Sequence, residues 1–344
     1  MFVCGLTMKA STPLDIASLA RYILSPECRS VAILSGAGVS VASGIPDFRS
    51  PGGMYDTLRP ELITASEQER QLMGIDPTYV VSWDIFARNA FPYLEVRRPF
   101  ILGTAKEQWK ATIAHRFAEL LHVKTAKLTR IYTQNIDGLD HQCDAIPTEK
   151  IVSVHGTISK VECEGCGASY PFDDFCEKVQ SNIRDIYNDG TNDTEASSPT
   201  KSSPIPCLSC GRPLVKPNTV LFGRNLPSEF FVRAEEDLPG VDLLIIAGTS
   251  LVVSPANSLV YNVPETTTRV VINLDEVGAE LGIDYDNEDA NDADKTDRRD
   301  LFLRGTCDEV FLNLIEELGW FPDLQKQVDL LPESSANLVR QRTG

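Results

Sequence analysis

The stretch VAILSGAGVSVASGIPDFRSPGGMY, residues 31–55, decides the fold. It begins with an apolar, partly β-branched run at residues 31–34, which is typical of a buried strand. Gly36 and Gly38 follow, and glycine permits a tight turn in which backbone amides approach a ligand. A strand, a glycine turn and a helix start predict a diphosphate site, because free amides and the helix dipole favour negative charge. Gly44 comes later than the fingerprint G-x-G-x-x-G requires, so a purely structural turn explains the glycines equally well.

The residues behind this turn favour the ligand-binding interpretation. Residues 44–50 read GIPDFRS, so Phe48 stands between the acid Asp47 and the base Arg49. An aromatic side chain flanked by opposite charges is unusual in a turn that has only a structural role. We therefore expect the segment to contribute to a nucleotide site.

Polar residues also follow three further predicted strands, at residues 128–133, 241–247 and 270–273. Ligands bind at the carboxyl ends of the strands in open parallel sheets. Amide and carboxylate groups there suit the ribose hydroxyls and the carboxamide of a nicotinamide nucleotide, and an acid can bind the adenine ribose. The residues in these positions are Gln134-Asn135-Ile136-Asp137, Gly248-Thr249-Ser250 and Asn273-Leu274-Asp275.

A short predicted strand, residues 151–154, ends at His155. A neutral imidazole titrates near physiological pH, so it can take a proton from a hydroxyl group. His115 and His122 lie on a predicted amphipathic helix, residues 112–123, and His141 lies on another helix. For these three we expect packed or solvated side chains without a catalytic role.

Two Cys-x-x-Cys pairs predict a metal site: Cys163 with Cys166, and Cys207 with Cys210. Four thiolates in this spacing suit tetrahedral zinc, and a site filled by protein ligands is structural because no position is open for catalysis. A redox role for either pair is the alternative. The pairs are separated by residues 167–206, in which residues 173–187 predict a helix and residues 188–206 a disordered polar loop.

Composition narrows the class of protein. The 344 residues carry 32 basic and 49 acidic side chains, for a formal charge of −17. This charge argues against direct nucleic-acid binding; it favours encounter with basic protein tails, although simple solubility explains it equally well. No apolar run approaches the roughly 20 residues of a membrane helix, and the N-terminus lacks the pattern of a signal peptide. We expect no membrane association, no secretion, and a location in the nucleus, the cytoplasm or both.

These blocks together resemble the sirtuins, the NAD-dependent protein lysine deacylases, and most closely the class that contains the eukaryotic protein deacetylases. The resemblance runs from about residue 17 to 320 in the order of that family. It implies an α/β fold, in which a Rossmann-like parallel-sheet domain carries a smaller inserted zinc-ribbon and helical module. The blocks that carry it are residues 31–55, 132–139 (YTQNIDGL), 154–156 (VHG), the two cysteine pairs, 247–251 (AGTSL) and 272–275 (INLD).

The resemblance also divides the chain. A catalytic domain is expected at residues 13–321, followed by an irregular C-terminal tail at residues 322–344. Within the domain we expect a Rossmann-like core at 13–55, 105–160 and 215–321, a helical insertion at 56–104, a zinc module at 161–214 and an acidic loop at 284–300.

The resemblance assigns roles to residues. His155 would be the general base, and Asn135 would be catalytic with it. Val220 and Phe222 would border the acyl-lysine tunnel, on a strand edge that pairs with the substrate peptide. Arg224 stands there where the family often has glutamate. The residues expected to bind NAD are Gly36, Ala37, Gly38, Val39, Ser40, Asp47, Phe48, Arg49, Gln134, Asn135, Ile136, Asp137, Gly248, Thr249, Ser250, Asn273, Leu274, Asp275 and Cys307.

The implied reaction is NAD-dependent deacetylation of protein lysine, in which the acetyl group passes to ADP-ribose and nicotinamide is released. NAD would be consumed as a co-substrate, one zinc ion would be structural, and the partners would be acetylated proteins or peptides such as histone tails. The alternatives are protein mono-ADP-ribosylation, removal of another acyl group, a silent NAD- or zinc-binding module and hydride transfer. Desuccinylases of the family carry a tyrosine and an arginine three residues apart; Tyr93 and Arg97 are four apart and do not meet that pattern.

Overall fold

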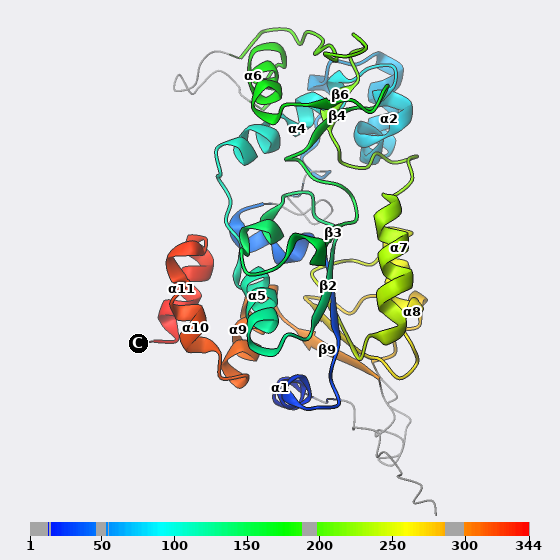
Figure 1. Cartoon of the computed structure of the whole chain (residues 1–344). Coiled ribbons are helices and arrows are strands. Elements are labelled where there is room, and N and C mark those ends of the chain that lie inside the picture. Colours follow the sequence, from blue (N-terminus) through cyan, green and yellow to red (C-terminus); the bar gives the residue numbers. More distant parts are fainter. Residues whose placement is uncertain are drawn as a thin grey trace, which may run out of the picture.

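The computed structural model describes residues 13, 15–45, 53, 55–187, 198–285 and 299–343. Its centre is a six-stranded sheet in the order β3-β2-β1-β7-β8-β9, and every pairing in it is parallel. A separate three-stranded sheet has the antiparallel order β5-β4-β6. Figure 1 shows the small sheet in the upper part of the molecule and the large sheet below it.

The strands of the large sheet are β1 (Val31–Ser35), β2 (Leu128–Thr133), β3 (Ile151–Ser153), β7 (Leu243–Ala247), β8 (Thr268–Asn273) and β9 (Asp300–Arg304). Those of the small sheet are β4 (Val161–Cys163), β5 (Ser169–Tyr170) and β6 (Val215–Pro217). The α-helices are α1 (Ile16–Leu24), α2 (Glu67–Ile75), α3 (Trp83–Phe86), α4 (Phe91–Ala105), α5 (Ile113–Thr125), α6 (Phe172–Asn182), α7 (Ser228–Asp237), α8 (Leu259–Asn262), α9 (Cys307–Glu317), α10 (Phe321–Gln325) and α11 (Glu333–Gln341).

Both faces of the large sheet are covered, which explains why its central strands are apolar throughout. Along β1, Val31 and Ile33 enter the hydrophobic cluster formed with α1, α5 and α9. Ala32 and Leu34, which point to the opposite face, pack with residues of α7 and α8. Successive side chains therefore point to opposite faces of the sheet, and a layer of helices covers each face. This is the Rossmann-like arrangement that the sequence predicts.

The order of the strands fixes where a ligand can bind. The chain leaves β1 for β2 on one side, and β7 occupies the other side. The connections at the carboxyl end of β1 and of its two neighbours therefore diverge, and the crevice at such a switch point is the usual ligand site of an open α/β sheet.

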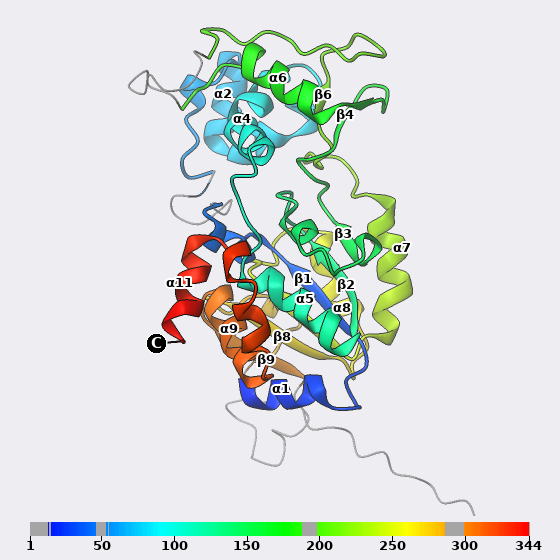
Figure 2. The same ribbon diagram turned by 60° about the vertical axis from the view of Figure 1, so that its left-hand side comes forward.

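The helical insertion and the zinc module pack as one unit. Buried residues of α3, α4 and α6 share a single hydrophobic cluster with residues of β4 and β6. Figure 2 shows α2, α4 and α6 gathered around β4 and β6, away from the large sheet. Segments that are separate in sequence thus build the smaller module together.

The expected irregular tail is wrong. Residues 322–343 contain most of α10 and all of α11. Leu331, Ala336 and Val339 are buried in the same hydrophobic cluster as residues of α5 and α9. Two hydroxyl groups fasten α11: Ser334 donates to the carbonyl of Ala42, and Ser335 donates to the carboxylate of Asp308. The C-terminal helices therefore cover one side of the large domain (Figure 2).

Two expected loops end in ordered structure. In the zinc module, residues 188–197 lie outside the described residues, but Ile205 is buried and the Ser203 amide donates to the carbonyl of Asn182. In the acidic loop, residues 286–298 lie outside the described residues, whereas Asp300 begins β9 and accepts two hydrogen bonds from Arg269 at 2.5 and 2.6 Å. The sequence predicted loops because these segments are polar in composition. The contacts that order their ends come from residues distant in sequence, which composition does not reveal.

Candidate active site

The glycine turn lies directly against the end of β7. The Gly36 amide donates to the carbonyl of Ala247, and the Gly38 amide donates to the carbonyl of Gly248 at 2.8 Å. A Cβ atom on Gly38 would come within 2.6 Å of the Gly248 Cα atom, closer than real Cβ atoms come. These positions are glycine because two backbones meet here.

The chain after the turn differs from the expected helix start. Between Gly36 and Gly44 the described chain forms two 3-10 turns, Ala37–Val39 and Val41–Ser43. Gly44 then adopts a left-handed conformation with φ of 86°. The helix dipole therefore gives less support to an anion than the sequence suggested, and the close packing of backbone amides remains.

The segment Gln134-Asn135-Ile136-Asp137 ties the glycine turn to β2. The side-chain nitrogen of Asn135, Nδ2, donates to the Gly36 carbonyl at 3.0 Å and to Ser40 Oγ at 3.2 Å. Gln134 Nε2 donates to Thr249 Oγ1 at 3.0 Å. Asp137 accepts from Ser40 Oγ and from the Leu139 amide, while burial raises the pKa of its carboxyl group.

His155 has a defined tautomer. Its Nδ1 lies 3.0 Å from the Gln134 carbonyl, and a carbonyl can only accept, so Nδ1 carries the proton. The other ring nitrogen, Nε2, is then an unprotonated base. Burial lowers the pKa of His155, against the opposing effect of the Gln134 hydrogen bond, so the neutral base prevails at neutral pH.

A cavity of about 740 Å³ connects these elements at the carboxyl end of the large sheet. Its lining runs from the glycine turn past His155 to the edge that follows β6. The predicted site residues in the lining are Gly36, Ala37, Gly38, Gln134, Asn135, Ile136, His155, Val220, Phe222, Gly248, Thr249, Ser250, Asn273, Leu274, Asp275 and Cys307.

Some predicted residues do not line the cavity. Val39 is buried in the hydrophobic core, and the side chains of Ser40 and Asp137 bond to each other behind Asn135. These three support the lining residues from behind. The trio Asp47, Phe48 and Arg49 lies outside the described residues.

The cavity also has lining residues that the sequence reasoning did not select. Tyr93 and Arg97 both face it from α4, one helical turn apart. The Tyr93 hydroxyl lies 2.7 Å from Thr219 Oγ1, next to the predicted tunnel residue Val220. Their four-residue spacing was a usable signal, because residues at i and i+4 share a helix face.

The remaining histidines lie outside the cavity lining. His115 is buried, and its Nδ1 accepts from the Thr112 amide at 3.1 Å, which begins α5. His122 lies on α5 and His141 on a 3-10 turn, Leu139–Gln142, and neither lines the cavity.

Hydrogen bonds fix the predicted peptide edge, at Val220 and Phe222, beside His155. The Val220 amide donates to the His155 carbonyl at 2.9 Å, which joins this edge to the histidine. Further along, Phe222 pairs with residues 81–83: its amide donates to the Val81 carbonyl, and its carbonyl accepts from the Trp83 amide. The edge therefore has a fixed position relative to the imidazole.

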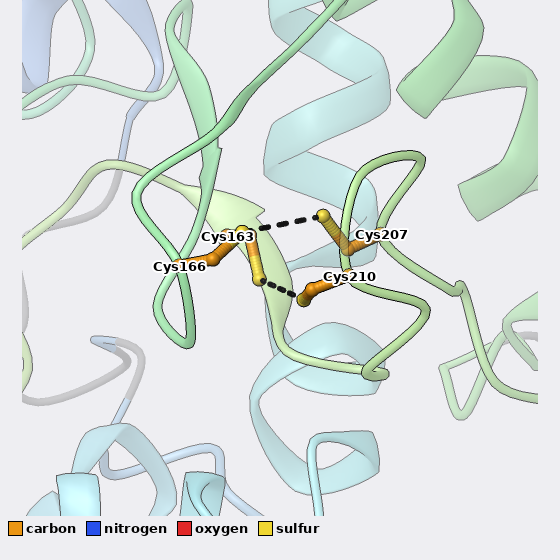
Figure 3. Close-up of side chains that lie close together, drawn as sticks. All are labelled: Cys163, Cys166, Cys207 and Cys210. Atoms are coloured by element: carbon orange, nitrogen blue, oxygen red, sulfur yellow. Dashed lines mark hydrogen bonds between the residues drawn. The ribbon is translucent and has the colours of Figure 1, made fainter.

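The four predicted metal ligands converge in the smaller module (Figure 3). All four sulfur atoms lie within 4.8 Å of one another, with Cys163–Cys210 and Cys166–Cys207 separations of 3.7 Å. A tetrahedron with Zn–S bonds of about 2.3 Å has edges of about 3.8 Å, so the cluster fits one zinc ion. Gly167 and Gly211, which follow the two pairs, both have φ of 73° and turn the chain around the site.

Comparisons with known proteins agree with this geometry. The Sir2 family model matches residues 36–255. The NAD-dependent protein deacetylase sirtuin-2 of Danio rerio is 34% identical, over 93% of this chain and 76% of its own length. The NAD-dependent protein deacetylase sirtuin-3 of Mus musculus is 31% identical, over 95% of this chain and 81% of its own length.

A histone-directed relative and a solved structure complete the comparison. The NAD-dependent histone deacetylase SIR2 of Saccharomyces cerevisiae is 30% identical, over 88% of this chain and 50% of its own length. A solved structure described as "Structural Basis for the Mechanism and Regulation of Sir2 Enzymes" has the same fold, with a TM-score of 0.63 and 24% identity. It covers 89% of this chain and 98% of the solved one. Within the described ranges, none of the helices combines the length and the apolar character that crossing a membrane requires.

Proposed function

The chain belongs to the Sir2 family, and on that premise we propose that it is an NAD-dependent protein lysine deacetylase. One observation carries the proposal: a single cavity of about 740 Å³ contains the glycine turn, His155 and the edge at Val220 and Phe222. The names of the relatives all state deacetylation, and none favours ADP-ribosylation or another acyl group. Acetyl transfer to NAD-derived ADP-ribose needs both substrates in one cavity.

Residues at the sheet end would hold NAD. Gly36, Ala37 and Gly38 line the cavity, and the two glycines, which have no side chain, would let the diphosphate approach the backbone there. Asn273 donates to the Thr249 carbonyl at 3.1 Å, and Leu274 and Asp275, which also line the cavity, would bind a ribose. Asn135, supported by Ser40 and Asp137, would lie at the nicotinamide end, and the Cys307 backbone would lie near adenine.

The chemistry would follow from this arrangement. The acyl oxygen of acetyl-lysine attacks C1′ of the nicotinamide ribose, and nicotinamide leaves. His155 Nε2 then takes a proton from a ribose hydroxyl, whose oxygen attacks the imidate carbon. Water then adds to that carbon and the C–N bond to lysine breaks, so one water molecule is consumed and the products would be lysine, nicotinamide and O-acetyl-ADP-ribose. The zinc ion would have a structural role only.

Substituting Gly38 is expected to weaken NAD binding. Gly38→Ala puts a Cβ atom 2.6 Å from the Gly248 backbone, which cannot rotate away. Overpacking costs about 1–3 kcal/mol. Because the glycine turn must shift away from the geometry that would take NAD, a binding cost of this size lowers affinity about 5- to 140-fold, since each 1.4 kcal/mol is tenfold. Isothermal titration with NAD measures this loss. Gly74→Ala is the control, since its Cβ atom would meet nothing within 4 Å, and NAD affinity equal in both variants would contradict the prediction.

The partners follow from the same proposal. We infer acetylated proteins as substrates, with histone tails among them, since one relative is named a histone deacetylase. Such substrates correspond to a location in the nucleus, the cytoplasm or both. With a formal charge of −17, the chain is not expected to bind nucleic acid directly.

Mass spectrometry tests the proposed function. The protein is incubated with NAD and with acetyl-, succinyl- and long-acyl-lysine peptides. NAD-dependent loss of the acetyl group with release of nicotinamide is the expected result. If no peptide loses an acyl group and ADP-ribose appears on protein instead, the proposal is wrong.

A further inference from the structure

The peptide edge ends in a positive charge at the rim of the cavity. Arg224 lines the same cavity as His155, Val220 and Phe222. Its side chain is 41% exposed, so a bound molecule can reach it. The established parts of the site leave this residue without a role.

The guanidinium group of Arg224 is held in place before any substrate arrives. It lies over the ring of Trp83, with its central carbon 3.9 Å from the ring centre. Its Nη2 donates to Glu164 Oε2 at 2.9 Å. Stacking and an ion pair together fix the plane of the group, which reduces the entropy lost when it binds a carboxylate.

The single negative charge of Glu164 does not neutralise all the positive charge near it. Its other oxygen, Oε1, pairs with Lys216 at 2.9 Å, so one carboxylate faces two cations. Lys216 is fully buried, and its ammonium group also donates to the carbonyls of Pro217 and Thr219. The Lys216 ammonium group is therefore bound internally, and of the two cations paired with Glu164 it is Arg224 that lines the cavity.

An arginine side chain has five N–H donors. In the described part of the chain, Glu164 is the side chain that accepts from Arg224, through one of them. The guanidinium fork matches a carboxylate, which it can bind with two parallel hydrogen bonds. The chemical group that fits this position is an aspartate or glutamate side chain.

We propose that Arg224 is a specificity-determining residue that favours acyl-lysine substrates with an acidic residue close to the modified lysine. The inference rests on the proposed deacetylase function and on the peptide lying along residues 220–224.

The chain geometry limits where the acid must stand. The Val220 amide donates a hydrogen bond to the His155 carbonyl, and the Arg224 amide donates to the Leu221 carbonyl in a turn. Four extended residues span at most about 13 Å, and the turn shortens this distance. A peptide strand advances about 3.3 Å per residue, so an acid one to three residues from the acyl-lysine reaches the guanidinium group.

This local preference opposes the field of the whole molecule. The formal charge of −17 attracts basic peptides over long distances. Salt near 0.15 M screens charges beyond about 8 Å, whereas a contact pair at Arg224 is shorter than that. The contact preference is therefore best measured at this ionic strength.

The test uses acetyl-lysine peptides with alanine at the flanking positions. Glutamate or lysine is placed in turn at each position from three before to three after the acetyl-lysine. The readout is the ratio of kcat/KM for the glutamate peptide to that for the lysine peptide, from nicotinamide release at 0.15 M salt. For the parent protein we expect a ratio of about fivefold at one or two positions, the upper range for exposed pairs.

Two substitutions and a matched control identify the residue. Arg224→Gln should bring the ratio close to one, and Arg224→Glu should invert it. Arg233→Glu makes the same charge change on α7, where Arg233 is 35% exposed in its side chain and pairs with Glu236 at 2.9 Å, outside the cavity lining. This control should keep the parent ratio.

The outcomes separate this inference from the proposed function. A parent ratio near one at every position, or equal shifts for Arg224→Glu and Arg233→Glu, would overturn the role of Arg224. Fluorescence anisotropy with the same peptides gives the preference without turnover. A parent protein that deacetylates no peptide refutes the proposed function, and the anisotropy ratio still decides whether Arg224 selects acids.

Discussion

His155→Ala is expected to lower the deacetylation rate by about 10²- to 10⁴-fold, the contribution of a positioned general base. The Nδ1 proton is committed to the Gln134 carbonyl, so the substitution removes the Nε2 atom that would take the ribose proton. Folding should persist, because the side chain is only partly buried at the cavity wall. NAD affinity should change little.

The order of the steps makes this prediction specific. Nicotinamide leaves before the base acts, so exchange of labelled nicotinamide should survive in His155→Ala. Asn135→Ala should lose exchange and deacetylation together, because Asn135 holds the Gly36 carbonyl and, in the proposed arrangement, would lie at the nicotinamide end. His141→Ala is the control, since His141 does not line the cavity. Deacetylation near the parent rate in His155→Ala would refute the mechanism.

The same residue sets the acid side of the pH profile. The base must be unprotonated, and burial lowers the pKa of His155 below the ordinary value of 6.5. Deacetylation by the parent protein should therefore be at its plateau at pH 7 to 8 and decline only as the pH falls below about 6.5. A decline that begins well above that pH would assign the limb to another group.

Loss of zinc is expected to unfold the smaller module. The four sulfur atoms surround a tetrahedral position, and structural zinc contributes about 10–16 kcal/mol in isolated zinc fingers. Cys163→Ser should therefore abolish stoichiometric zinc and strongly lower the melting temperature. Deacetylation should fail with it, because the shared cluster of α4, α6 and β4 also positions Tyr93 at the cavity.

Cys176→Ser is the matched control for this experiment. Cys176 lies in the same module, on α6, and is also buried with a free thiol, but it is not among the converging sulfur atoms. It should retain one zinc ion per chain by metal analysis and lose only a small part of its stability. Full zinc content and an unchanged melting temperature in Cys163→Ser would show that the metal assignment is wrong.

Local patterns predicted the elements of the fold well where one interaction dominates. The strand at residues 128–133 is correct to the residue, and nearly all of its residues are buried in the sheet. Helix α5 matches its apolar spacing to within two residues. Polar residues placed directly after predicted strands reached the cavity, since strand ends in a parallel sheet share one edge.

Other features depend on contacts distant in sequence. Helix α11 has a polar sequence, and its buried face is defined by its contacts with α9 and with the turn Val41–Ser43. Asp300 has the composition of a loop acid, and its ion pair with Arg269 is visible only in the structure. Tyr93 and Arg97 are site residues only because α4 packs beside the peptide edge. The spacing of Tyr93 and Arg97 indicates a shared helix face, but no local pattern encodes what that face, α11 or Asp300 contacts.

The hydrogen bond between Ser334 and the Ala42 carbonyl spans 292 residues. During synthesis, the turn that would receive the diphosphate emerges early, whereas α11, which packs behind it, emerges last among the described helices. At about 5–20 residues per second, the interval is about 15–60 s. Throughout that time the nascent chain exposes the apolar residues that α11 later covers, and the nucleotide turn lacks its backing. Since a ligand stabilises the state that binds it, we expect NAD to stabilise most strongly the completed chains in which residues 333–341 have docked behind the turn.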